Sequence, residues 1–295
     1  MSAYVIEQLF NGLILGSLYA LVAIGFTMVY GILRLINFTH GDVVMIGAFV
    51  TLGLVMVRVP WPVLLVVVLI AGAAVGIVIE RVGFRPMRGA PQVTGFIASL
   101  ALSILIQNLG ILVFTAQPRN FLFPEVFQRI LSIGGLSVRV LNIFIVALSV
   151  FLMGVLLLLV HKTRLGMAMR ATAENLNVAR LMGIRVNRII MFAFAIGSAL
   201  AAFAGMLWGG KFGQIDPLMG FLPGLKAFVA AVIGGVGSIT GAMLGGFILG
   251  FGEVLFFGFL PNEYNAYRDA FVFGLLILIL LVLPSGLFGK EEERA

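Results

Sequence analysis

The sequence predicts an all-α, polytopic membrane protein, because of its composition and the length of its apolar runs. Apolar residues make up 61% of the 295 residues and charged residues only 11%. A water-soluble core does not have this composition. The apolar runs are about 20 residues long, enough for a helix to cross a hydrocarbon core of about 30 Å, and the alternating pattern of a transmembrane β-barrel is missing. We therefore expect one transmembrane helical bundle over residues 1–295.

About nine segments are long and apolar enough to be spans, with eight or ten as alternatives. They lie at residues 8–30, 41–57, 61–80, 93–114, 141–160, 189–209, 224–239, 241–257 and 270–283. The pair at 224–257 is ambiguous, because it predicts either two short helices that meet at 238–241 or one helix and a re-entrant segment. The number of spans depends on this pair.

Lys and Arg are unevenly distributed between the two sides of a nine-span bundle. Twelve of the 19 fall on the side that carries residues 161–188 and the C-terminus, and seven fall on the other. The side richer in positive charge is normally cytoplasmic. We therefore expect the N-terminus outside, the C-terminus in the cytoplasm, and a cytoplasmic loop at 161–188.

Several function classes are excluded by what the sequence lacks. The net charge is +7, but the basic residues flank spans and form no basic and aromatic platform, so nucleic acid is not expected as a partner. There is no Cys, and His40 and His161 are too isolated for a zinc centre, so we expect no metal, cofactor or catalytic residue on this chain. No Gly-x-x-x-x-Gly-Lys-Ser/Thr motif occurs, so the chain cannot itself hydrolyse ATP with a P-loop.

The loop at 161–188 is the most polar segment, with six Lys or Arg and one Glu in 28 residues. At helical spacing, one face carries Arg170, Glu174, Asn177 and Arg180. The other face carries Ala171, Val178, Leu181 and Met182. The pattern predicts a short amphipathic helix that stops at Gly183. Such a helix either rests on lipid headgroups or docks a soluble partner.

Four motifs follow one another along the chain. They are residues 35–42 (LINFTHGD), Arg170-Ala171 with residues 175–184 (NLNVARLMGI), Lys226-Ala227-Phe228 with the glycines from Gly234 to Gly246, and residues 284–289 (PSGLFG). Together they resemble the LivH family of branched-chain amino-acid ABC transporter permeases, and the resemblance covers nearly the whole chain. Thr39 stands where that family more often has Ala.

The resemblance implies a permease subunit in the bacterial inner membrane that imports branched-chain amino acids. The implied partners are a second, related permease chain, two cytoplasmic P-loop ATPases that bind ATP and Mg, and a periplasmic solute-binding protein. The helix in the 161–188 loop would couple the ATPases to transport, through Arg170, Ala171, Glu174, Asn175, Ala179, Leu181 and Gly183. Alternatives are an ABC permease for another small solute such as an amide, urea or sugar, an ion-coupled transporter acting alone, and a channel.

Polar groups inside the predicted bundle are the candidate path or gate residues, because such groups are costly in a membrane unless paired. Asn37, His40 and Asp42 predict either a gate or a plain helix start, in which Asn37 or Thr39 closes a turn and Asp42 lies in the first helical turn. Glu253 is either a hydrogen-bonded structural group or a path residue that meets the ammonium group of an amino acid.

Two further segments have open interpretations. Gly234 and Gly235 begin a glycine cluster that predicts either close helix packing or short helices along the path. Residues 115–140 form the longest predicted external loop. It is either a docking surface for the binding protein or a connector.

Overall fold

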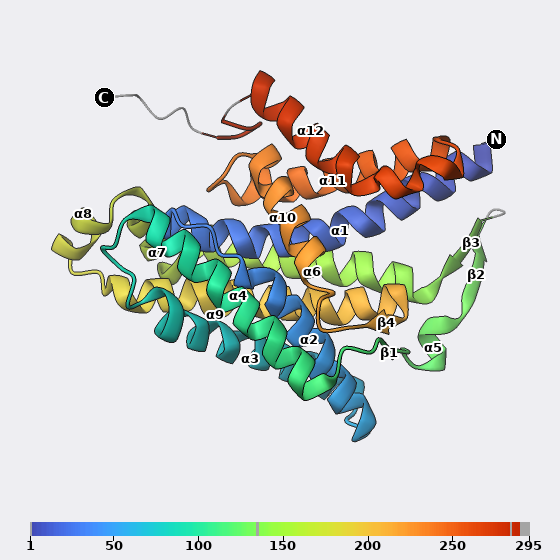
Figure 1. Cartoon of the computed structure of the whole chain (residues 1–295), viewed down its shortest axis with the longest axis horizontal. Helices are drawn as coiled ribbons and strands as arrows, with labels where there is room; N and C mark the ends of the chain where they lie inside the picture. The colour runs from blue at the N-terminus through green and yellow to red at the C-terminus, as the bar shows by residue number, and fades with distance from the viewer. Residues whose placement is uncertain (1, 134–135, 284, 290–295) are drawn as a thin grey trace.

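Long helices dominate the structure, and several of them, such as α1 and α6, run roughly along its longest axis (Figure 1). The computed structural model describes residues 2–133, 136–283 and 285–289. The long helices are α1 (Ser2–Leu33), α2 (Thr39–Met56), α3 (Trp61–Ile79), α4 (Gln92–Phe114), α6 (Val140–Lys162), α9 (Val186–Phe212) and α11 (Ile239–Phe259). These seven helices in the described part of the chain are long and apolar enough to cross a membrane. The predicted all-α membrane bundle is confirmed at this level.

Two of the nine predicted spans are shorter helices. They are α10 (Phe221–Gly234) and α12 (Arg268–Val282), with 14 and 15 residues. At a rise of 1.5 Å per residue, each covers about 21 to 23 Å, less than a hydrocarbon core of about 30 Å. The ambiguous pair therefore consists of the short α10 and the full-length α11, and the break between them lies at 235–238.

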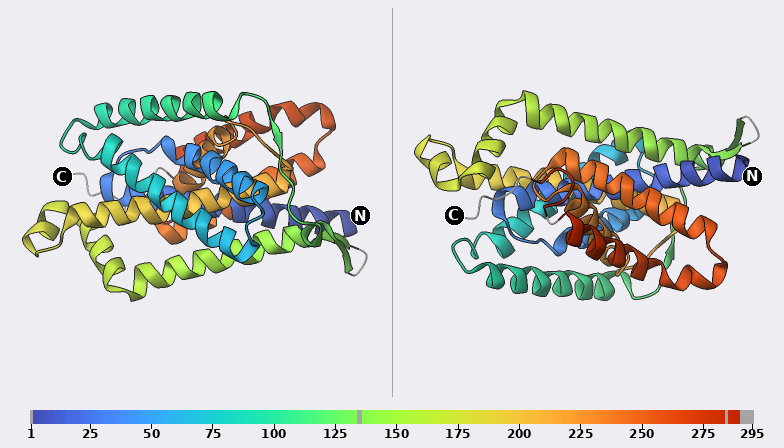
Figure 2. Two further views of the ribbon diagram at one scale, coloured as in Figure 1. Left: turned by 90° about the horizontal axis from the view of Figure 1, so that it is seen from below. Right: turned by 90° about the horizontal axis from the view of Figure 1, so that it is seen from above.

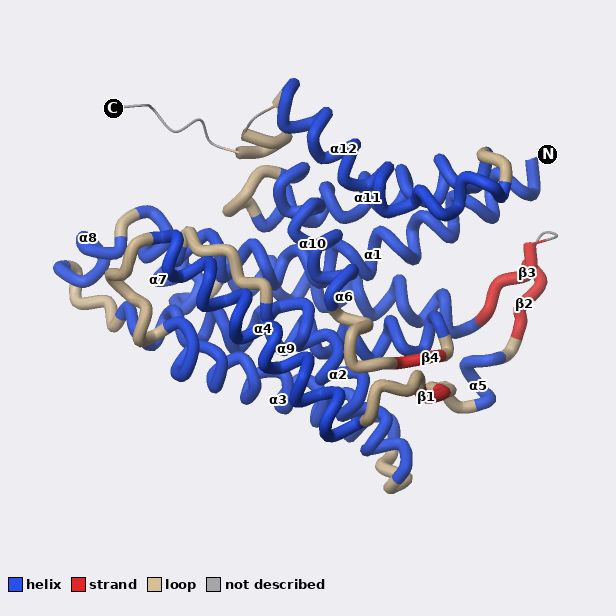
Figure 3. Tube along the Cα trace, in the orientation of Figure 1, coloured by secondary structure: helices blue, strands red, loops and turns tan. Residues whose placement is uncertain are grey.

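The remaining elements are short and gather at the two ends of the bundle (Figure 3). Near one end lie β1 (Arg119–Asn120), α5 (Glu125–Gln128), β2 (Ile130–Ile133), β3 (Leu136–Arg139), β4 (Gln214–Ile215) and η2 (Asn262–Tyr267). Near the other lie α7 (Arg164–Glu174), α8 (Leu176–Leu181) and the π-helix η1 (Glu80–Phe84) that continues α3. Strand β1 pairs antiparallel with β4, and β2 pairs antiparallel with β3. The first pairing ties the segment before α10 to the loop after α4.

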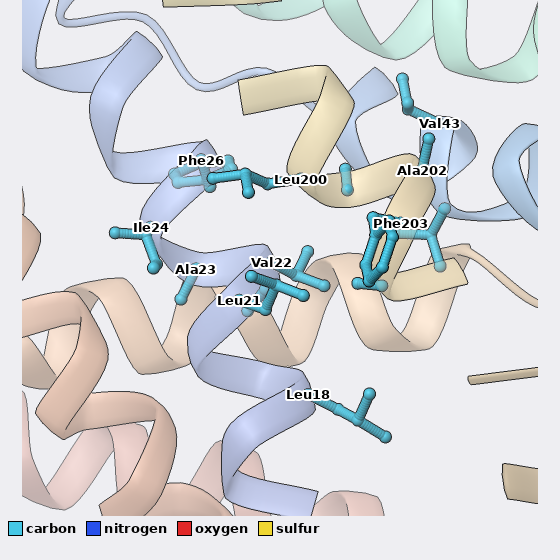
Figure 4. Packing of buried hydrophobic residues seen from close by; sticks show 14 of the residues in the cluster. Leu18, Leu21, Val22, Ala23, Ile24, Phe26, Val43, Leu200, Ala202 and Phe203 are labelled. Atoms are coloured by element: carbon cyan, nitrogen blue, oxygen red, sulfur yellow. The ribbon is translucent and has the colours of Figure 1, made fainter. Parts of the chain in front are cut away.

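Helix α1 lies at the centre of the packed core. It packs against α9, and Figure 4 shows apolar side chains of both helices, among them Val22, Leu200 and Phe203, in one buried cluster. Because α1 is surrounded by α9, α10 and α11, it is apolar on all sides rather than amphipathic. Helices α4 and α6 lie on opposite flanks (Figure 2), and many of their apolar side chains are exposed, as expected for helices that face lipid.

Helix α10 begins against α2 and α1 because glycines allow the backbones to meet. A Cβ on Gly224 would lie only 2.7 Å from the Cα of Gly41 in α2. Farther along α10, Phe228 packs edge-on against Phe26 of α1, with ring centroids 5.5 Å apart. Any side chain at Gly41 or Gly224 would separate α10 from α2.

The prediction of a single amphipathic helix through residues 170–183 is wrong. Asn175 has extended backbone angles (φ −155°, ψ 112°) and separates α7 from α8. Its Oδ1 accepts hydrogen bonds from the N–H groups of Asn177 and Val178, at 2.9 and 3.1 Å, and so caps α8. Asparagine favours such caps over the helix interior. The predicted helix stop at Gly183 is confirmed, since its φ of +81° ends α8 in the left-handed region.

Candidate functional site

A cavity of about 460 Å³ lies among α1, α9, α10, α11 and the start of α12. Its size falls in the usual range for small-molecule sites, about 300 to 1,000 Å³. It is lined by Leu15, Tyr19, Trp208, Phe212, Gln214, Asp216, Met219, Leu222, Pro223, Lys226, Glu253 and Arg268. A neighbouring hollow of about 290 Å³ shares Leu15, Phe212 and Arg268 and extends toward Gln8 and Gly258. The two hollows therefore follow α1 toward the N-terminal end of the bundle.

Charged groups form one wall of this cavity, around the buried carboxylate of Glu253. Glu253 Oε1 accepts a hydrogen bond from Lys226 Nζ at 2.9 Å and forms an ion pair with Arg268 Nε at 2.7 Å. Glu253 Oε2 accepts a hydrogen bond from the Tyr19 hydroxyl at 2.7 Å. Lys226 also forms an ion pair with Asp269 at 2.8 Å. A buried carboxylate must be compensated in this way to be stable.

The charged side chains of this wall differ in how far they are exposed. Glu253 and Lys226 are almost completely buried, whereas the side chains of Arg268 and Asp269 are each 45% exposed. Glu253 is thus hydrogen-bonded, as expected for a structural group. It also lines the cavity. The partners Lys226 and Arg268 were missed as site residues, because by sequence they look like charges flanking the ends of spans.

Aromatic and aliphatic side chains, which we call the apolar wall, form another part of the lining. Trp208 lies between Tyr19 and Phe212, with ring centroids 5.7 and 5.0 Å apart. Leu15 and Leu222 add aliphatic surface. The cavity therefore has one face for ionic groups and one for an apolar group. Among the described residues, no cluster of three His, Asp or Glu side chains suited to a metal ion occurs.

Asn37, His40 and Asp42 are buried together near the start of α2, away from the cavity. The Asn37 carbonyl closes a turn by accepting the His40 N–H at 3.3 Å, but no side chain caps α2. His40 Nε2 lies 3.1 Å from the Val22 carbonyl, and Asp42, in the first turn as predicted, accepts from Gln107 Nε2 at 3.0 Å. Within the described residues, His40 Nδ1 and Asp42 Oδ2 have no hydrogen-bond partner. His40 and Asp42 thus each retain one atom that could form a further hydrogen bond.

Gly234 and Gly235 form the end of α10, and they do not line the cavity. The N–H of Leu287 donates to the Ile233 carbonyl at 2.9 Å, and the N–H of Phe288 donates to the Gly234 carbonyl at 3.0 Å. Gly235 turns the chain with a φ of +98°. The segment after α12 therefore satisfies carbonyls that the end of a helix leaves open.

The predicted coupling residues lie at the α7–α8 end of the bundle. Ala179 is buried and anchors α8, whereas the remaining six are exposed: Arg170, Ala171, Glu174, Asn175, Leu181 and Gly183. Leu181 is 88% exposed and the adjacent Met182 is 77% exposed. With Val178, they form a protruding apolar knob, which we call the α8 knob. Exposed apolar groups that lie together are typical of an interaction surface.

A second buried charge cluster lies near this end, and sequence reasoning missed it. Glu80 is fully buried at the start of η1 and forms ion pairs with Arg85, at 3.3 Å, and with Arg88. Arg88 also donates to the side chain of Asn187 in the first turn of α9. Burial lowers the pKa of the Arg88 guanidinium, the charge of Glu80 opposes that shift, and Arg180 of α8 adds to it. Glu80 is therefore, like Glu253, a buried carboxylate paired with two cations. The short sequence spacing of Glu80, Arg85 and Arg88 could have indicated this charge cluster.

Comparisons with known proteins identify similar chains over almost the full length. A family model described as branched-chain amino acid transport system / permease component matches residues 8–280. The chain is 42% identical to the high-affinity branched-chain amino acid transport system permease protein LivH of Escherichia coli (strain K12), covering 98% of this chain and 97% of that protein.

Two further relatives broaden the comparison. Permease protein BraD of a high-affinity branched-chain amino acid transport system, from Pseudomonas aeruginosa, is 42% identical, covering 97% of this chain and 96% of BraD. The ribose import permease protein RbsC of Escherichia coli (strain K12) is 30% identical, covering 98% of this chain and 88% of RbsC. No solved structure matches the chain significantly.

Proposed function

Because the chain belongs to the family of branched-chain amino acid transport permeases, we propose that it is the membrane subunit of an ATP-driven importer of branched-chain amino acids. The near full-length similarity to LivH and BraD carries this proposal. The cavity supports it, since a branched-chain amino acid has two charged groups and an apolar side chain. We place the subunit in a bacterial inner membrane.

The partners in this proposal are a second permease chain, two cytoplasmic ATPases that bind ATP and Mg, and an external solute-binding protein. The decisive experiment reconstitutes these components in proteoliposomes and measures uptake of labelled leucine. Uptake should require ATP inside and the binding protein outside. Uptake by the single chain without ATPases would instead support an ion-coupled transporter or a channel. A competition panel with amides, urea and ribose tests the alternative solutes.

The orientation proposed here has the N-terminus outside and the C-terminus in the cytoplasm. The N-terminus lies near the β2–β3 hairpin, whereas residues 287 and 288 bond to the far end of α10 (Figure 1). An odd number of crossings fits this arrangement, and nine are obtained if α10 and α12 are counted with the seven long helices. The β2–β3 end would then face the binding protein. Cysteine accessibility at the two ends of the bundle, measured with an impermeant reagent, tests the orientation.

We propose that α7 and α8 transmit ATPase movement to the bundle. The α8 knob offers apolar surface to a partner, while α7 packs against α1, α6 and α9. The substitution Leu181→Asp should therefore abolish attachment of the ATPases and reduce uptake about tenfold or more, since a buried interface anchor is worth about 2 kcal/mol. Leu131→Asp, on the β2–β3 hairpin at the other end, is the matched control for ATPase attachment. Normal ATPase attachment and uptake in Leu181→Asp would contradict the proposal.

The translocation path in this proposal includes Glu253 and the buried group of Asn37, His40 and Asp42. The unpartnered atoms His40 Nδ1 and Asp42 Oδ2 support this role, because they could bind water or solute in another conformation of the transporter. Gly234 and Gly235 would act as the flexible end of α10. Uptake by Asp42→Asn in the reconstituted system tests the assignment, and an unchanged rate would remove Asp42 from the path.

A further inference from the structure

We propose that the 460 Å³ cavity binds the amino acid in transit, with Arg268 and Lys226 holding its α-carboxylate and Asp216 its ammonium group. This inference rests on the proposed function and assigns the substrate groups to side chains. Glu253 then has a different role from the acceptor of the ammonium group considered above. It holds the two cations in place.

The guanidinium of Arg268 is fixed on one side and open on the other. Its Nε is paired with Glu253 Oε1 at 2.7 Å, and its Cζ lies 5.8 Å from the centre of the Phe257 ring. Within residues 2–133, 136–283 and 285–289, no hydrogen bond from its Nη nitrogens is present. A guanidinium donates in a fixed fork and binds carboxylates through two parallel N–H groups. The Nη pair is thus a preformed carboxylate site at the wall of the cavity.

Lys226 adds a second cation to the same wall. Its ammonium group has three N–H donors. It donates one to Glu253, and it also forms an ion pair with Asp269. In addition, α10 begins at Phe221 beside the cavity, and its first-turn residues Leu222 and Pro223 line it. The N-terminus of a short membrane helix carries a partial positive charge that favours an anionic substrate group. All three features favour an anion at this wall.

Glu253 is the poorer ammonium acceptor in this geometry, because its Oε1 is already paired with Lys226 and Arg268 and its Oε2 accepts from Tyr19. Asp216 is the other carboxylate lining the cavity. Its Oδ1 accepts the Leu218 N–H at 2.8 Å, and no cation pairs with it within the described residues. It therefore has capacity for an ammonium group.

The apolar wall completes the match to a branched-chain amino acid. Trp208 and Phe212 form a continuous aromatic surface, and Leu222 faces the same cavity. An aliphatic side chain placed there leaves water, which stabilises the complex by about 25 cal/mol per Å² of apolar surface. The same wall would disfavour a polar side chain.

The test measures ligand binding and uptake by the assembled transporter. Leucine, 4-methylpentanoate, which lacks the amino group, and 3-methylbutylamine, which lacks the carboxylate, are compared by saturation-transfer NMR in nanodiscs without the binding protein. We expect leucine to bind best, the carboxylate analogue to depend on Arg268, and the amine to bind at least about tenfold more weakly than leucine. Equal binding of leucine and the amine would overturn the carboxylate assignment.

The substitution Arg268→Gln should weaken leucine binding and uptake about tenfold or more, while ATPase stimulation by the loaded binding protein persists. Arg268→Lys should restore part of the binding. Arg58→Gln, which removes an exposed arginine between α2 and α3, is the matched control. Asp216→Asn should weaken leucine but leave 4-methylpentanoate unchanged.

The outcomes separate this inference from the proposed function. If the wild-type complex imports leucine and Arg268→Gln binds and imports it equally well, the carboxylate site is wrong and the importer remains. If the wild-type complex imports no amino acid under any condition, the proposed function itself is overturned. A loss of ATPase stimulation in Arg268→Gln would show a structural effect and would also overturn the assignment.

Discussion

Two buried glutamates, Glu253 and Glu80, face the same physical problem in two regions of the molecule. Each has an almost inaccessible carboxylate, and each is paired with two cations. Around Glu253 the cations line a cavity. Around Glu80 the less exposed cation, Arg88, is held by protein on two sides, because it also donates to the side chain of Asn187 in α9.

The difference shows what a buried carboxylate can be used for. The Glu80 cluster joins η1, the loop before α4 and the start of α9, and its less exposed cation, Arg88, bonds to protein groups on two sides. The Glu253 cluster joins α1, α10, α11 and α12 and leaves the Nη side of Arg268 open. We therefore expect loss of Glu80 to affect stability first, and loss of Glu253 to affect transport first.

The largest effect is expected for Glu80→Ala. Arg88, whose side chain is only 16% exposed, would keep its charge without the buried partner. Removal of one partner of a buried ion pair costs about 3 to 5 kcal/mol. Far less folded protein should be recovered from membranes, and the thermal unfolding midpoint in detergent should fall. Glu125→Gln, at an exposed glutamate of α5, serves as the control. An unchanged midpoint would show that the Glu80 cluster contributes little.

An intermediate loss of stability is expected for Glu253→Gln. Asp269 remains beside Lys226, and water in the cavity can solvate Arg268, so we expect a loss of about 2 kcal/mol, in the range for hydrogen bonds to charged groups. Leucine uptake should nevertheless fall sharply, since both cations lose the group that positions them. The comparison of the two glutamates fails if Glu253→Gln unfolds as readily as Glu80→Ala.

The smallest effect is expected for Tyr19→Phe. It removes one hydrogen bond to Glu253 and leaves both ion pairs in place, so the expected loss of stability is about 1 kcal/mol. Tyr30→Phe provides the control, because the described structure shows no hydrogen bond from the Tyr30 hydroxyl. A loss as large as that of Glu253→Gln would mean that Tyr19, rather than the cations, dominates the cluster.

The helical bundle could be predicted from sequence because the length of an apolar run is a local property. Seven predicted spans became long helices for this reason. The sequence left a short helix at this place as one of two interpretations, and the position of α10 could not be decided in the same way. It depends on Gly41 of α2 and on residues 287 and 288, which are distant in sequence. At Asn175, continuation of α7 competes with a side-chain cap that starts α8. The helical periodicity of apolar and polar residues does not show which of the two is more stable.

The candidate site was predicted in part. Glu253 could be found because a carboxylate inside a span needs a partner, but the partners themselves could not. Lys226 and Arg268 look like charges flanking spans until α10, α11 and α12 are folded together. Glu80 was missed because it stands at the last position of a predicted span, where a charged residue usually reaches water.

The hydrogen bonds at the end of α10 have a consequence for the order of events during biosynthesis. The ribosome completes α10 before it makes Leu287 and Phe288, whose N–H groups cap the carbonyls of Ile233 and Gly234. Until then these carbonyls must be satisfied by water or lipid headgroups. Helix α10, which carries Lys226, therefore reaches its final state only after residues 287 and 288 have been made.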